Sequence, residues 1–172
     1  MVGLLFVAAL LAVAAASYLQ IYKSLVRKDN LCESAWEVLD AQLARRSETI
    51  SKLLADTPTP SEEHNAELQY LARMQAAVDS ATKPESKMSA SAELTSVLNA
   101  LISSSEIKPE LQQELEDVDT KLTYARASYN DCVRTYNDAI TTFPGKPVAR
   151  KKFLPRQSFE AVGDTARQHV TR

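Results

Sequence analysis

Residues 111–143, LQQELEDVDTKLTYARASYNDCVRTYNDAITTF, place apolar side chains mostly at alternating steps of four and three. Such spacing puts one apolar stripe along a helix and is typical of helices that pack as coiled coils. The stripe comprises Leu111, Leu115, Val118, Leu122, Ala125, Tyr129, Cys132, Tyr136 and Phe143. We predict one long amphipathic helix, which Lys108-Pro109-Glu110 opens and Pro144-Gly145 ends.

Three further stripes precede it. The first spans residues 25–53 and comprises Leu25, Cys32, Trp36, Leu39, Leu43, Ile50 and Leu53. Two shorter stripes follow over residues 68–78 and 88–101, with Pro84 between them. No run alternates apolar and polar residues as a β-strand would. Short connections between amphipathic helices favour antiparallel neighbours, so we predict an antiparallel four-helix bundle with long first and last helices.

The segment before these stripes, MVGLLFVAALLAVAAASYLQIY at residues 1–22, contains no charged side chain. A helix needs about 20 mostly apolar residues to cross a bilayer, and this segment is long enough. A cleaved signal peptide is the alternative, because Ala14-Ala15-Ala16 resembles a cleavage site. A signal peptide carries basic residues before its apolar core, and none stands there. We therefore expect an uncleaved transmembrane helix that continues into an all-α bundle.

Basic residues flank only one end of this segment, at Lys23, Arg27 and Lys28. Basic flanks stay on the cytoplasmic side of a membrane. The chain is therefore expected to be a single-pass protein of the cell inner membrane, with its N-terminus outside and its body cytoplasmic. A reducing cytoplasm also suits Cys32 and Cys132 as free thiols.

Charge divides the chain into a transmembrane anchor (1–22), a helical bundle (23–143) and a basic C-terminal tail (144–172). The bundle has 13 Lys and Arg against 20 Asp and Glu, whereas the tail has seven against two. An acidic body repels phosphates, so nucleic acid is not an expected partner. The tail is a candidate for anionic lipid on the inner leaflet, with a merely solvated tail as the alternative. Its proposed lipid-contact residues are Lys146, Arg150, Lys151, Lys152, Phe153 and Arg156.

Arg46 occupies a position on the first stripe where an apolar residue is expected. A buried cation needs a partner, and antiparallel pairing that sets Tyr22 opposite Phe143 brings Arg46 close to Asp119. We interpret this pair as a structural ion pair that fixes the helix register, with a binding role as the alternative. The same register puts Cys32 and Cys132 at one level.

No pattern in the chain predicts an enzyme, a metal site or a cofactor. Four-helix bundles that hold two metal ions use Glu-x-x-His pairs, and neither His64 nor His169 belongs to one. Three scattered glycines cannot form a phosphate-binding loop.

The chain resembles the LemA family at both ends of the bundle. In the first helix the resemblance is carried by residues 22–26, 35–36 and 40–46. In the last helix it is carried by Ala125-Arg126, Tyr129-Asn130, Val133, Tyr136-Asn137, Ile140 and Phe143-Pro144, and in the tail by Phe153 and Phe159-Glu160. The resemblance implies a membrane-anchored helical bundle with its N-terminus outside, and it implies no mechanism.

The Tyr-Asn pairs at 129–130 and 136–137 stand one heptad apart. Tyrosines at helical spacing usually fill a core, and the amides would then satisfy neighbouring polar groups. The alternative is an exposed strip that binds a partner.

For the whole chain, the leading hypothesis is a membrane-anchored interaction or scaffold protein with unidentified cytoplasmic protein partners. The second is a membrane-surface module whose tail binds membrane lipid, and an enzyme with an unfamiliar site is the third.

Overall fold

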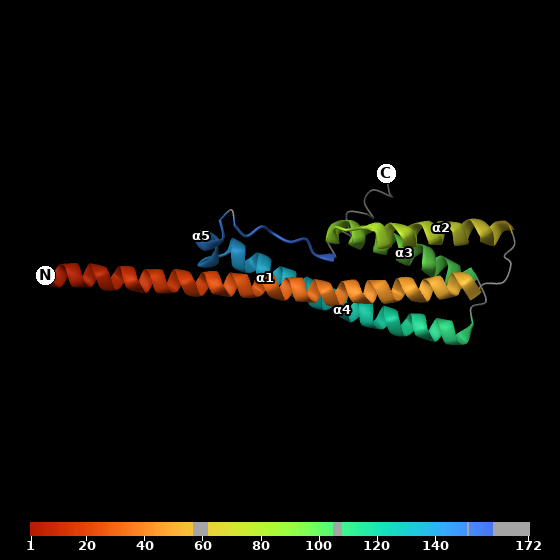
Figure 1. Cartoon of the computed structure of the whole chain (residues 1–172), viewed down its shortest axis with the longest axis horizontal. Helices are drawn as coiled ribbons and strands as arrows, with labels where there is room; N and C mark the ends of the chain where they lie inside the picture. The colour runs from red at the N-terminus through yellow and green to blue at the C-terminus, as the bar shows by residue number, and fades with distance from the viewer. Residues whose placement is uncertain (57–61, 105–107, 151, 160–172) are drawn as a thin grey trace. The chain divides into compact units, whose positions relative to one another are not determined.

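A computed structural model describes residues 1–56, 62–104, 108–150 and 152–159 (Figure 1). Over these ranges the chain forms five helices and no strand, so the predicted all-α fold is confirmed. The helices are α1 (Val2–Asp56), α2 (Glu62–Ser80), α3 (Pro84–Ser104), α4 (Pro109–Thr141) and α5 (Gly145–Ala149). Lys151, His169 and the side chains of His64 and Leu101 lie outside the described part.

The chain divides into two compact units. We call residues 1–34 with 131–156 the anchor unit, and residues 35–130 with 157–172 the bundle unit. Residues 144–156 therefore belong to the same unit as the N-terminal segment, whereas the sequence suggested a separate tail from residue 144.

The bundle unit has a core to which α1, α2, α3 and α4 all contribute. α2 and α3 lie side by side in it (Figure 1). Several polar side chains are also buried in this unit, among them Gln75, whose Nε2 donates to the Ser47 carbonyl at 2.8 Å and to Ser51 Oγ at 2.7 Å. The apolar core cluster comprises Ile50, Leu53, Leu71, Val78, Leu94, Leu98 and Leu115.

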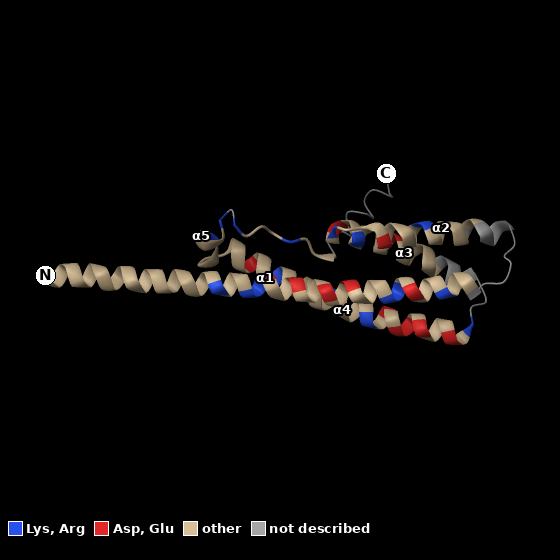
Figure 2. Cartoon of the chain, in the orientation of Figure 1, with Lys and Arg blue, Asp and Glu red and all other residues tan. Residues whose placement is uncertain are grey.

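In the anchor unit, residues 2–20 of α1 are all exposed, and the helix first becomes buried at Leu25. No charged side chain interrupts the exposed stretch (Figure 2). Within the described residues, α1 is the one helix long and apolar enough to cross a membrane. The buried part of the unit includes Leu25 and Cys32 of α1 and Val133, Tyr136 and Ile140 of α4.

The predicted stripe on α4 is wrong at its C-terminal end. Phe143 is 88 % exposed and Cys132 is only partly buried, while Val133 and Ile140 are buried instead. A strict heptad advances 3.5 residues per turn, but a straight helix advances 3.6, so the two drift apart by about 20° per heptad. After Tyr129 the buried positions are therefore Val133, Tyr136 and Ile140: Tyr136 keeps its predicted place, whereas Val133 replaces Cys132.

Candidate functional site

The turn from α4 into α5 depends on Gly145, which is buried. A Cβ atom at this position would overlap the Ala139 carbonyl oxygen and would lie 3.6 Å from Leu25 Cδ2. Only glycine lets the backbone approach α4 this closely. Val148 and Ala149 are buried behind it, so α5 is packed onto the anchor unit instead of leaving it.

After α5 the chain runs without regular structure and is held by polar side chains of α4. In the anchor unit the Tyr136 hydroxyl donates to the Leu154 carbonyl at 3.0 Å. The amide of Asn137 bonds Arg156 twice: Nδ2 donates to its carbonyl at 2.8 Å, and Oδ1 accepts from its N–H at 3.0 Å. The side chains of a Tyr-Asn pair thus hold main-chain groups that would otherwise lack partners.

The other Tyr-Asn pair does the same within the bundle unit. The Tyr129 hydroxyl donates to the Gln157 carbonyl at 3.2 Å, and Asn130 Oδ1 accepts from the Phe159 N–H at 2.7 Å. The two Tyr-Asn pairs are seven residues apart in α4, whereas the backbone groups that they bind are three residues apart in the following segment.

Both tyrosine rings are buried. The Tyr129 ring also meets Trp36 edge-to-face at 5.6 Å. Burial of the rings agrees with the structural interpretation of the Tyr-Asn pairs. Their backbone partners beyond residue 150 could not be foreseen, because the heptad repeat signals a shared helix face and says nothing of what the amides bond.

Two of the six proposed lipid-contact residues are engaged inside the anchor unit. Arg156 bonds Asp29 at 2.9 Å and Glu33 at 3.1 Å, one helical turn apart on α1. Phe153 is buried and packs edge-to-face on Tyr22 with ring centroids 5.7 Å apart. Both side chains are therefore engaged in contacts within the anchor unit, and their contact with lipid stays a prediction. Charge along the sequence could not reveal partners more than a hundred residues away.

Lys146, Arg150 and Lys152 remain exposed. Lys152 Nζ lies 4.6 Å from the centroid of the Tyr22 ring and donates to its hydroxyl. This hydrogen bond raises the pKa of Lys152. Lys151 cannot be placed, since it falls outside the described residues. Among the described basic side chains of this region, Arg156 pairs with carboxylates, Lys152 is exposed but contacts Tyr22, and Lys146 and Arg150 are exposed.

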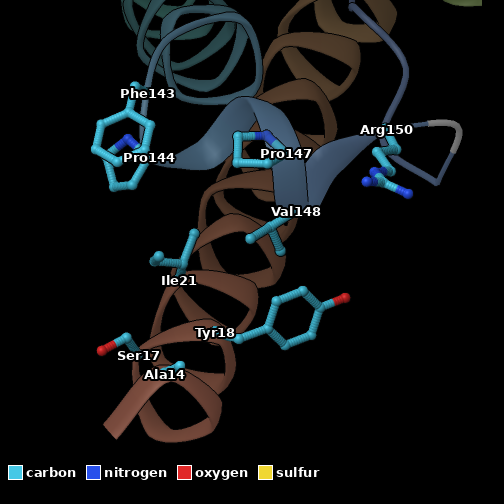
Figure 3. A pocket seen from close by; sticks show the side chains of 9 residues that line it. All are labelled: Ala14, Ser17, Tyr18, Ile21, Phe143, Pro144, Pro147, Val148 and Arg150. Carbon is cyan, nitrogen blue, oxygen red and sulfur yellow. The ribbon is translucent and has the colours of Figure 1, made fainter. Parts of the chain in front are cut away.

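A groove of about 520 Å³ lies between α1 and α5 in the anchor unit (Figure 3). Ala14, Ser17, Tyr18 and Ile21 of α1 form one wall. Phe143, Pro144 and Arg150 stand on the other side, with Phe143 and Arg150 at opposite ends (Figure 3). Arg150 adopts φ 37°, an uncommon conformation for a residue other than glycine. The groove is mostly apolar and has one cation at its edge.

In the bundle unit, the structure brings the predicted pair Arg46 and Asp119 together. Arg46 Nε lies 2.8 Å from Asp119 Oδ1, and Nη1 donates to Thr95 Oγ1 at 2.8 Å. Burial lowers the pKa of Arg46, although Asp119 opposes this effect. A second guanidinium, Arg126, donates to Ser91 and stacks on the Phe159 ring at 4.3 Å. Burial, with Arg46 nearby, lowers the pKa of Arg126 to about 10.

In the described part of the chain, no group of three or more His, Cys, Asp or Glu side chains is placed to hold a metal ion. The polar clusters found here are an ion pair and backbone clamps, and neither contains a nucleophile paired with a base.

Comparison with protein families matches the LemA family model over residues 35–171, which is most of the chain. The chain belongs to the LemA family. The match includes both Tyr-Asn pairs, Arg46 and Asp119, and it begins after the apolar segment. Comparison with curated proteins gives no match. Family membership assigns no chemical activity to the chain.

The clamp on Arg156 gives a prediction for this LemA protein. Asn137→Ala removes two hydrogen bonds and should lower the free energy of unfolding by about 1–3 kcal/mol. Hydrogen exchange at the Arg156 amide should accelerate, because this N–H loses its acceptor. Asn30→Ala, at an exposed position of α1, is the matched control and should leave exchange at Arg156 unchanged. Unchanged exchange at Arg156 in the Asn137 variant would contradict the clamp.

Cys32 gives a prediction about pH. Both cysteines are free, and burial, assisted by nearby Cys132, raises the pKa of Cys32 to about 11. The thiolate reacts with iodoacetamide, so Cys32 should label about a hundredfold more slowly than an ordinary thiol at pH 8. Because its folded pKa lies above its unfolded pKa, this thiol stabilises the fold fully below pH 9, and its contribution is lost as pH rises toward 11.

The measurement uses Cys132→Ser, in which only Cys32 can be labelled, and compares native protein with protein in denaturant. Cys32→Ser reports the partly exposed Cys132 in the same way, and that thiol should react faster. Equal native rates for the two thiols would show that Cys32 is not protected.

Proposed function

We propose that the chain is a membrane-anchored scaffold of the LemA type, which presents its helical units to cytoplasmic protein partners. The observation that carries this proposal is the start of α1, where residues 2–20 are uncharged, mostly apolar and exposed. A soluble protein rarely exposes so large an apolar surface, and a bilayer would cover it. Basic residues at 23, 27 and 28 then favour a cytoplasmic body on the inner membrane, with the N-terminus outside.

Exposed aromatic side chains on the bundle unit support a protein partner. Tyr124 of α4 is 74 % exposed, and Tyr70 of α2 is also exposed. Tyrosine is enriched in protein interfaces, because its ring provides contact area and its hydroxyl a hydrogen bond. These two positions are the best places to look for contact with a partner.

A photoreactive amino acid at residue 124 or 70 tests the scaffold function in cells. Irradiation should give discrete crosslinked bands whose partner is the same in repeated experiments. Lys121, exposed on the same helix as Tyr124, is the control position. Bands of equal strength at residues 121 and 124 would indicate random collision, and absence of bands at both tyrosines would argue against a scaffold.

A second candidate function is a membrane-surface module that binds anionic lipid. It is supported by exposed apolar side chains near cations in the anchor unit. Phe143 is 88 % and Leu154 70 % exposed. The exposed cations are Lys146, Arg150 and Lys152. Basic and apolar side chains together favour an anionic interface. Binding of residues 23–172 to vesicles should require anionic lipid, weaken with salt and fall in the triple glutamine variant of those three cations. Equal binding to neutral vesicles would reject this function.

A further inference from the structure

The side chains that line the groove between α1 and α5 suit a lipid, and the groove lies near one end of the proposed transmembrane segment. Its α1 wall lies inside the segment proposed to span the membrane, near the end of that segment where Tyr18 and Tyr22 stand. Tyrosine favours the headgroup region of a bilayer. If the anchor spans the membrane, the groove therefore opens among headgroups, with Ala14 toward the acyl chains.

The side chains along the groove separate an apolar part from a charged end. Ile21, Phe143 and Pro147 offer carbon surface, and Phe143 is almost fully exposed beside it. Arg150 supplies a guanidinium at the other end (Figure 3), and exposed Lys146 follows Gly145 in the same short helix. None of the residues lining the groove is acidic. This charge distribution complements an anionic headgroup with an acyl chain.

We infer that the groove holds one anionic phospholipid, with its phosphate on Arg150 and its acyl chain running past Ile21 toward Ala14. The inference rests on the membrane anchor of the proposed function. It differs from adsorption of a basic tail, because it assigns a single lipid to a shaped site. Ser17 has no tertiary hydrogen bond, since its Oγ donates to the Val13 carbonyl of the same helix. A larger side chain at residue 17 can therefore block the groove while every charge is kept.

The test uses the full chain in nanodiscs made from equal amounts of phosphatidylglycerol and phosphatidylcholine, followed by native mass spectrometry. One phosphatidylglycerol should be retained per protein, in preference to phosphatidylcholine. Arg150→Gln should reduce this retention about five- to tenfold, as expected for loss of one cation at an anionic headgroup. Arg134→Gln, at an exposed position of α4 in the same unit, is the charge-matched control and should have no effect.

Ser17→Phe should abolish retention of the bound lipid, and Ala14→Leu is a milder variant with the same purpose. Helical content by circular dichroism establishes that each variant is folded. Retention of both lipids in equal amounts, retention of neither, or retention unaffected by Arg150→Gln and Ser17→Phe would overturn the site. Extraction from membranes by alkaline carbonate tests the anchor separately. Protein that resists extraction but retains no lipid refutes only the groove, whereas extracted protein refutes the anchor.

Discussion

Gly145→Ala should destabilise this protein by about 2–3 kcal/mol or more, the upper part of the range for overpacking. The added methyl would overlap the main-chain carbonyl oxygen of Ala139, which cannot rotate away as a side chain could. Relief requires α5 to move off α4, and Val148 and Ala149 would then lose their burial. We expect a lower midpoint of urea unfolding for the detergent-solubilised protein, and faster hydrogen exchange at the amides of Lys146, Val148, Ala149 and Arg150.

Gly3→Ala is the control, because no atom lies within 4 Å of a Cβ built on Gly3. Both substitutions replace glycine by alanine in a helix, where alanine has the higher propensity. A stability difference between the two variants therefore isolates the close approach at Gly145. An unfolding midpoint in Gly145→Ala equal to that of the control would mean that α5 does not pack on α4 as described.

The sequence was most informative where contacts repeat along a helix. Leu39, Leu43, Ile50 and Leu53 were expected on one face of α1 and are buried. Arg46 and Asp119 could be paired because antiparallel helices rise by the same distance per residue. Counting 24 residues along each helix from the assumed pairing of Tyr22 with Phe143 leads to these two positions. Periodicity was sufficient for these features, and no knowledge of individual contacts was needed.

The fate of the segment after Pro144 could not be predicted in this way. Three interactions hold it: the close fit of Gly145, the backbone bonds of Asn137, and the two carboxylates that bind Arg156. Each one joins positions far apart in the sequence and none repeats. A cluster of cations in an apparently loose tail resembles a lipid-binding segment, whether or not one member already has acidic partners. Lys146, Arg150 and Lys152 are exposed, whereas Arg156 is engaged with Asp29 and Glu33.

Asp119→Ala should have the largest effect among the polar substitutions, a loss of about 2–4 kcal/mol. Removing one partner of a buried pair leaves an uncompensated charge. Arg46 is only 2 % exposed, so it cannot recover water, and Thr95 supplies its remaining hydrogen bond. Arg126 is near enough for Arg46 to lower its pKa, and without Asp119 no carboxylate would oppose that repulsion. Urea unfolding at pH 7 measures the loss. Asp131→Ala, which breaks an exposed ion pair with Arg134, is the matched control and should have little effect.

Substitution of the other partner, Arg46, should cost much less stability. This difference between the two partners is a sharper test of the ion pair than either variant alone. Asp119 is 37 % exposed, so water can solvate its carboxylate when Arg46→Met replaces the guanidinium with an apolar chain. Replacing both members of a buried ion pair by apolar residues often costs little stability, which bears on the double variant. We therefore expect Arg46→Met to cost about 1 kcal/mol or less, and the double variant with Asp119→Ala to recover most of what Asp119→Ala loses alone. If Arg46→Met is the more damaging change, the guanidinium itself supports the bundle core. If the two single losses simply add, the pair does not set the register of α1 and α4.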